Sequence, residues 1–137
     1  MDSLPIRLPP NTDLRRALED AVAATRWRSA FVVCGIGSLS RAQIRFAGAP
    51  GPTVIEADLE IISVSGTVSP DGAHLHLSVA DADGKVLGGH AAYGCIVRTT
   101  AELLLAMSPD WSLAREHDPA TGFSELRVSQ PAPPLTP

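Results

Sequence analysis

Three of the four histidines of this chain lie in one short stretch, residues 66–94. Within residues 73–80, polar and apolar side chains alternate with a period of two, the pattern of a β-strand with one apolar face. His74 and His76 are therefore expected on the same side of that strand. Imidazole nitrogen is a common zinc ligand, and three histidines with an open fourth position form a known zinc arrangement. The position of His90 decides whether such a site can form.

The turn that follows this strand predicts where His90 lies. Residues 81–85, Asp-Ala-Asp-Gly-Lys, suit a three-residue hairpin loop in which the two outer residues pair and Gly84 takes the left-handed position. Counting back along both strands places His90 opposite His76, provided that Gly88-Gly89 inserts no bulge. Directly opposed side chains lie about 4.5–5.5 Å apart, so three imidazoles could reach one ion. A slip of one residue would send His90 to the other face.

A plainer interpretation stays open, in which these histidines are ordinary polar residues on a sheet surface that faces solvent or another subunit. The spacing His-x-His is a weak signal, because a metal site depends on ligand geometry. If the site were catalytic, a carboxylate would have to accept a proton, and Glu60, Asp81 and Asp83 are the candidates. The fourth histidine, His117, lies in a separate polar segment and is interpreted as a surface residue.

The composition predicts one globular domain. The chain has 137 residues, of which 45% are hydrophobic and 19% charged, enough to bury a core. Its 11 basic and 15 acidic residues leave a net charge of −4, which argues against the broad basic footprint of a nucleic-acid-binding protein. Local arginine groups, 15–16 with 26–28 and Arg41 with Arg45, are the only candidates for DNA contact, and such groups usually face solvent.

The cysteines and the termini indicate where the protein is found and how the chain is divided. Cys34 and Cys95 lie in apolar runs, where a small buried side chain is the usual role and a disulfide is not indicated. The sequence begins without a basic and apolar leader, and no segment approaches the roughly 18 consecutive apolar residues needed to cross a bilayer. We therefore expect a cytoplasmic protein without membrane contact. We divide it into one domain, residues 1–128, and a Pro-rich tail, residues 129–137, expected to be extended or disordered.

The expected fold class is α+β, with one amphipathic helix that covers one side of an antiparallel or mixed, strand-rich sheet. The helix is expected to have its N-cap at Asn11 or Thr12, Asp13 in its first turn, and its end near Trp27. Strands are expected at residues 6–8, 29–36, 43–46, 53–68, 73–80, 95–107 and 123–128, besides the return strand that carries His90. One helix cannot cover a sheet of six or more strands, so the uncovered apolar surface predicts self-association.

Three segments allow more than one structure. Residues 35–39, Gly-Ile-Gly-Ser-Leu, predict a glycine-rich bend, which could cradle an anion on its N–H groups or, as we favour, turn a tight corner between strands. Residues 101–107, at the end of a long apolar run, are read as strand although their propensity is helical. Residues 111–118 are expected to form a loop or a short turn.

Several of these segments together resemble the plants-and-prokaryotes-conserved (PPC) domain. They are GIGSL followed by Ala42, EIISVSGTVSPDG at residues 60–72, HLHLSVAD at residues 74–81, and GKVLGGH with GCIV between residues 84 and 97. The match runs over residues 6–128. The resemblance implies an α+β domain that assembles as a homotrimer. In some prokaryotic members, three histidines that match His74, His76 and His90 hold a zinc ion.

The resemblance also bears on function. In plants the domain is preceded by an AT-hook, an Arg-Gly-Arg-Pro element that enters the minor groove of DNA, and bacterial relatives are labelled DNA-binding proteins by that association. This sequence contains no such element. We therefore expect a trimeric interaction or ligand-binding module that binds Zn²⁺ through His74, His76 and His90 and has a protein or small-molecule partner. DNA binding and a zinc-dependent enzyme remain as alternatives, and a non-enzyme is favoured over an enzyme.

Overall fold

The computed structural model describes residues 1–130, so the Pro-rich tail predicted for residues 129–137 lies almost wholly outside the described residues. The elements in order are β1 (Asp2–Leu8), α1 (Leu14–Ala23), β2 (Ala30–Arg45), β3 (Thr53–Ser69), β4 (Gly72–Ala80), β5 (Val86–Ala91), β6 (Ile96–Met107), β7 (Ser112–Asp118) and β8 (Phe123–Ser129). No helix in this part of the chain is long and apolar enough to cross a membrane.

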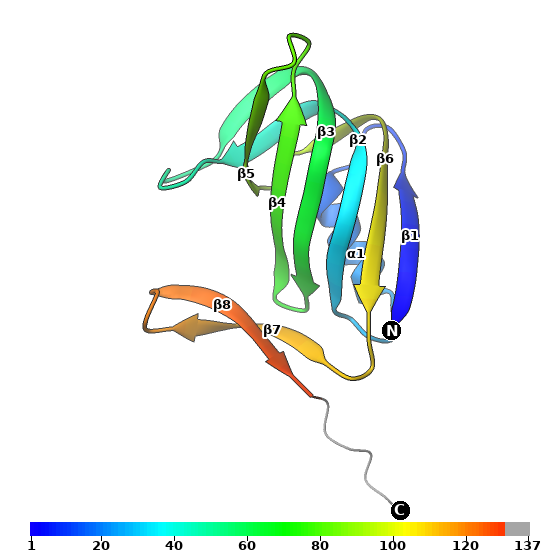
Figure 1. Cartoon of the computed structure of the whole chain (residues 1–137), viewed down its shortest axis with the longest axis vertical. Coiled ribbons are helices and arrows are strands. Elements are labelled where there is room, and N and C mark those ends of the chain that lie inside the picture. Colours follow the sequence, from blue (N-terminus) through cyan, green and yellow to red (C-terminus); the bar gives the residue numbers. More distant parts are fainter. Residues whose placement is uncertain (131–137) are drawn as a thin grey trace, which may run out of the picture.

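Six strands form one sheet in the order β1-β6-β2-β3-β4-β5, and β7 and β8 form a separate hairpin beside one end of it (Figure 1). Every strand pairing is antiparallel, which confirms the α+β prediction and removes its mixed-sheet alternative. The far end of β2 also pairs with β5, so strands β2 to β5 curl until the sheet meets itself. This closure brings Arg45 directly opposite His90.

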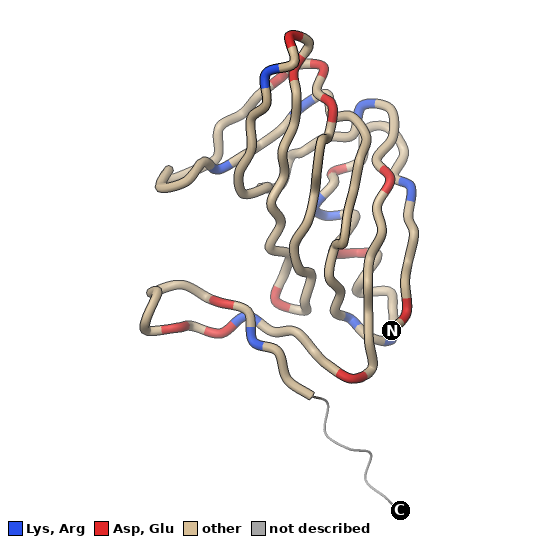
Figure 2. Tube along the Cα trace, in the orientation of Figure 1, with Lys and Arg blue, Asp and Glu red and all other residues tan. Residues whose placement is uncertain are grey.

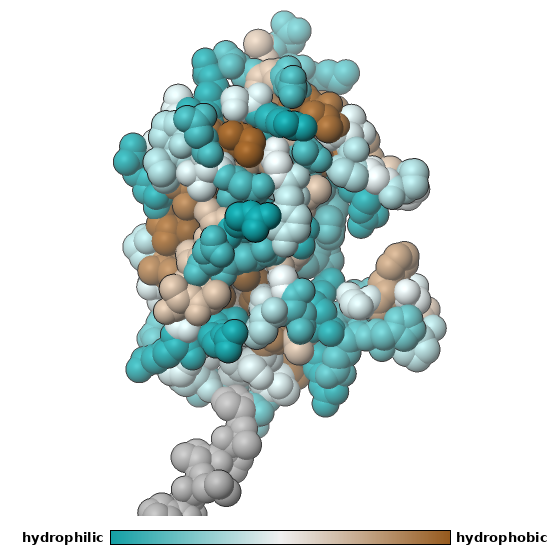
Figure 3. All heavy atoms as spheres, turned by 180° about the vertical axis from the view of Figure 1, so that it is seen from behind, coloured by the Kyte–Doolittle hydropathy of each residue, from teal (hydrophilic) through white to brown (hydrophobic). Residues whose placement is uncertain are grey.

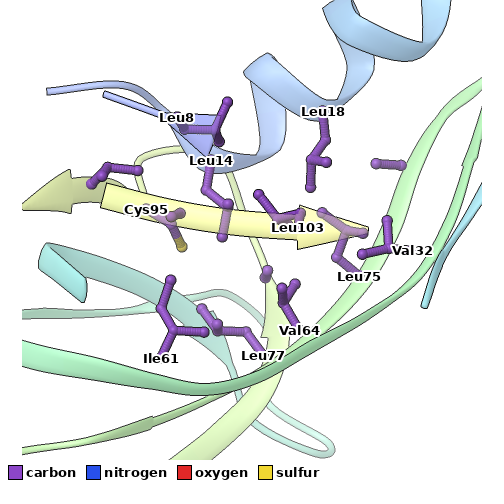
Figure 4. Close-up of a cluster of buried hydrophobic side chains, with 14 of the residues drawn as sticks. Leu8, Leu14, Leu18, Val32, Ile61, Val64, Leu75, Leu77, Cys95 and Leu103 are labelled. Carbon is purple, nitrogen blue, oxygen red and sulfur yellow. The ribbon is translucent and has the colours of Figure 1, made fainter. Parts of the chain in front are cut away.

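The hydrophobic core lies between α1 and one face of the sheet. Leu14 and Leu18 are fully buried and point from α1 toward the sheet, where Leu75 and Leu77 of β4 are also buried (Figure 4). The alternation of β4 therefore turns its leucines toward the helix and its histidines toward the other face. Seen from behind, the surface is largely hydrophilic, with hydrophobic patches separated by polar side chains (Figure 3).

The helix begins later and ends earlier than the sequence predicted. Its N-cap is Asp13, whose carboxylate accepts the backbone N–H groups of Arg15 and Arg16 at 3.1 and 3.2 Å. The predicted cap at residues 11–12, with Asp13 inside the first turn, is therefore wrong, as is the predicted end near Trp27. Asp13 is the N-cap because its carboxylate accepts two of the backbone N–H groups in the first turn that have no partner within the helix.

The glycine-rich segment 35–39 forms no corner between strands, because β2 continues through it as one strand, although its pairing with β6 shifts register between Gly37 and Leu39. A Cβ on Gly35 would collide with Val64, and one on Gly37, whose φ is +143°, would collide with the backbone of Thr100. The glycines thus let neighbouring strands approach closely. Both predicted roles of the segment, a corner and an anion cradle, are wrong.

Two further local predictions are wrong, and one ambiguity is resolved. Residues 112–118, seven of the eight expected to form a loop or short turn, form strand β7, since β8 pairs with it along its length. Cys34 is exposed, because a register shift between Val32 and Cys34 turns its side chain outward, whereas Cys95 is buried as expected. Residues 101–107 are strand, because pairing with both β1 and β2 outweighs helical propensity.

Candidate metal centre

The hairpin of β4 and β5 has the register that the sequence predicted. The N–H of Asp81 donates to the carbonyl of Lys85 at 3.0 Å, and Gly84 adopts a φ of +76°. His76 is then paired directly with His90. The glycines of β5 insert no bulge, so the count from the turn holds along the whole pair.

The three imidazoles converge on the sheet face opposite α1. Their ring centroids are separated by 5.2 Å between His74 and His76, 4.8 Å between His74 and His90, and 5.8 Å between His76 and His90. One ring nitrogen from each lies within 4.8 Å of the others. Zinc with Zn–N bonds of about 2.0–2.1 Å needs nitrogens about 3.4 Å apart, so small side-chain rotations suffice. The donor set and its spacing therefore fit a three-histidine metal site.

Burial and charge keep two of these rings neutral. Burial, followed by the positive charges of His74 and Arg45, lowers the pKa of His90 to about 4. Burial and the positive charge of Arg115 also lower the pKa of His74 below its ordinary value. Both rings are therefore unprotonated at neutral pH, and each offers one nitrogen lone pair to a ligand.

Arg115 of β7 already uses the lone pair of one ring. Its guanidinium donates to Nδ1 of His74 at 2.8 Å, and its backbone N–H donates to the carboxylate of Asp71 at 2.9 Å. A neutral imidazole accepts at only one nitrogen. A metal ion and Arg115 therefore cannot hold His74 together. The sequence offered no sign of this contact, because residues 111–118 were expected to be a loop.

A cavity of about 680 Å³ opens beside the three histidines. Its lining includes the three imidazoles together with Arg45, Phe46, Arg115, Phe123 and Glu125. Residues from β2, β4, β5 and the β7–β8 hairpin thus meet around one space. Acidic and basic positions both occur on the hairpin (Figure 2).

A model of the Plants and Prokaryotes Conserved (PCC) domain, also abbreviated PPC, matches residues 1–108. The chain belongs to this family. Two proteins named Bifunctional protein GlmU, from Synechococcus strains JA-2-3B'a(2-13) and JA-3-3Ab, are each 43% identical to this PPC domain, over 97% and 93% of its length. It spans about a fifth of those relatives, since the match covers 22% and 21% of them.

Solved structures share the fold over nearly the whole PPC chain. A hypothetical protein from Salmonella is 34% identical with a TM-score of 0.92, and the match covers 96% of this chain and 95% of that one. A metal-containing protein from Archaeoglobus fulgidus is 24% identical with a TM-score of 0.71, over 91% and 92%. A protein from Bacteroides thetaiotaomicron, described as a candidate DNA-binding protein, is 20% identical with a TM-score of 0.80, over 91% of each chain. At these lower identities the likeness establishes the fold alone.

The three carboxylates proposed from the sequence as proton acceptors lie at the turn end of the β4–β5 hairpin, far from the histidines. Asp81 is five residues from His76 along the chain, about 16 Å for an extended strand, and Asp83 lies in the turn beyond it. Glu60 is paired with Ala80 and is therefore at the same distant end. The carboxylate that shares the cavity is Glu125 of β8, which sequence reasoning missed because no local pattern marks it.

Three of the six arginines proposed for DNA contact, Arg15, Arg26 and Arg41, form ion pairs with carboxylates. Arg15 contacts Glu19 at 3.1 Å, and Arg41 contacts Glu56 at 3.8 Å. Arg45, by contrast, lines the histidine cavity. Of the six arginines, three therefore take part in local ion pairs and one lines the histidine cavity.

Proposed function

We propose that this PPC domain is a metal-binding interaction module that works as a homotrimer, with Zn²⁺ held by His74, His76 and His90. The observation that carries the proposal is the convergence of three imidazoles, with one nitrogen from each within 4.8 Å of the others. When bound, zinc would supply a Lewis-acidic centre with an open position. The histidines would hold it, and the cavity beside them would receive the partner, a small molecule or a protein segment.

Metal content tests the site directly. Purified chain incubated with Zn²⁺ and passed over a desalting column should retain one zinc per chain by elemental analysis. His90→Ala should lose it, because two imidazoles cannot replace three ligands. His117→Ala is the matched control, since His117 is exposed on β7 and is absent from the cluster. Wild-type protein without stoichiometric zinc, or a His90→Ala variant with unchanged content, would refute the proposal.

The trimer is proposed from the sheet face opposite α1. Phe31, Val33 and Ile36 of β2 are exposed by 38%, 54% and 58%, although each is a large hydrophobic side chain. Apolar side chains gathered on one strand of an uncovered sheet face favour association with another copy. The family resemblance points to the same assembly.

DNA binding is the weaker alternative. It is favoured by the description of the Bacteroides neighbour, and the net charge of −4 counts against it. A gel shift on duplex DNA at low salt tests this alternative, because a protein that relies on phosphate contacts should bind DNA most strongly at low salt. The absence of a shift under these conditions would exclude DNA binding. Enzyme activity is less favoured still, since Glu125 is the one carboxylate that lines the main histidine cavity of the described chain.

A further inference from the structure

Two arginines flank the three histidines from different elements. Arg45 is directly opposite His90 in the pairing of β2 with β5, and Arg115 reaches His74 from β7. Within residues 1–130, neither arginine forms an ion pair with a carboxylate, in contrast to Arg15 and its partner Glu19. Two arginines without an ion-pair partner thus line the same cavity.

With a metal bound, the charge around the histidines is unbalanced. The hydrogen bond of 2.8 Å from Arg115 to Nδ1 of His74 brings one positive charge directly against the cluster. Zinc would add two further positive charges. The nearby carboxylates are Glu125, which accepts a hydrogen bond from the hydroxyl of Thr121 at 3.0 Å, and Asp71, which accepts the backbone N–H of Arg115 at 2.9 Å. Two carboxylates would balance the two arginines but not a divalent cation as well, so the metal-loaded space favours an anionic guest.

The cavity has room for more than an inorganic ion. Its volume of about 680 Å³ falls in the range of about 300–1,000 Å³ typical of sites for small organic ligands. Phe46 and Phe123 contribute aromatic surface to its wall. The lining therefore combines cationic groups at the histidines with apolar surface beside them, which suits a ligand that has one charged end and one apolar part.

We propose that the cavity binds a small organic anion whose carboxylate or phosphate group pairs with Arg45 and Arg115, while its apolar part lies against Phe46 and Phe123. This inference rests on the proposed metal site, because metal binding at His74 releases Arg115 from the imidazole. The freed guanidinium then has donors available for an anion, and guanidinium groups match carboxylate and phosphate oxygens in a bidentate geometry.

Calorimetric titration of the zinc-loaded full-length chain with benzoate and with phenylphosphonate tests the inference. Zinc content is measured on the same sample. At least one probe should bind at one per chain, and the tighter of the two identifies the preferred charged group. The zinc-free chain should bind the tighter probe several-fold more weakly, because Arg115 remains hydrogen-bonded to His74 when no metal is bound.

Matched arginine variants make the test specific. Arg45→Gln should weaken binding about tenfold or more while zinc content stays at one per chain, since a charge-assisted hydrogen bond is lost. Arg41→Gln is the control, because Arg41 lies on the same strand but pairs with Glu56. A zinc-loaded chain that binds neither probe, or equal binding by the Arg45 and Arg41 variants, would overturn the ligand inference alone. Failure to load zinc would instead refute the metal site, and the ligand inference with it.

Discussion

At the scale of single residues, the lone pair of His74 that Arg115 uses is the one that the proposed metal ion would need. Arg115 donates to its Nδ1 at 2.8 Å, and the other two histidines lie close enough to share a metal with it. Metal binding must therefore break the arginine contact, whichever ring nitrogen the ion uses. On the proposed function, Arg115 should therefore weaken metal binding and, once released, strengthen anion binding.

This competition predicts the effect of Arg115→Met on zinc affinity. Methionine keeps an unbranched stem but cannot donate a hydrogen bond or repel a cation. Zinc should bind about fivefold more tightly, as expected when a contact worth about 1 kcal/mol no longer has to be broken. Competition with a chromophoric chelator measures the change. Arg127→Met is the control, because Arg127 pairs with Glu116 on the same hairpin. Unchanged or weaker zinc binding in Arg115→Met would show that the contact does not oppose the metal.

At the scale of elements, the position of the histidines depends on how closely β3 and β4 approach each other. Gly66 of β3 is paired with Leu75, next to His74, and has a φ of +146°. A Cβ at this position would collide with the backbone carbonyl of His74. Glycine is therefore required both for the backbone conformation and for the contact between strands.

Gly66→Ala should destabilise the protein by about 3 kcal/mol, since it adds backbone strain to a steric collision. It should also weaken zinc binding, because the strand that carries His74 is displaced. Urea unfolding and the zinc titration measure the two effects. Gly51→Ala is the control: a Cβ there meets no atom within 4 Å, and we expect a change below about 0.5 kcal/mol. Similar stabilities for the two variants would contradict this account of β3 and β4.

At the scale of the whole molecule, a single short helix leaves most of one sheet face uncovered. The histidines occupy the β4–β5 side of this face, and the exposed apolar side chains of β2 lie toward the end of that strand away from Arg45, the residue paired with His90. Covering those side chains with another copy would remove apolar surface from water without altering the hairpin that carries the histidines.

Ile36→Lys should prevent this association, because it places a charge where an apolar contact is proposed. Light scattering at micromolar concentration should give a trimer for the wild type and a monomer for the variant. Circular dichroism should be unchanged, since Ile36 is already 58% exposed in the single chain. Ser40→Lys, another exposed position on β2, should remain trimeric. A monomeric wild type would remove the trimer from the proposed function.

The sequence by itself determined the hairpin and, through it, the candidate site. A tight turn sets the register of the two strands that it joins, so counting from Gly84 was enough to place His76 opposite His90. The alternation of apolar and polar residues in β4 then decided which face the histidines share. Both are local properties, because each depends on residues within one short stretch of chain.

Only the tertiary structure decided what surrounds the histidines. Arg45 comes to His90 because the sheet curls until β2 meets β5, and Arg115 comes to His74 because β7 pairs with β8 beside the sheet. Neither contact follows from a turn or a period, since each joins residues more than forty positions apart in the chain. Such contacts depend on how whole elements pack, and packing distance is what a local pattern does not encode.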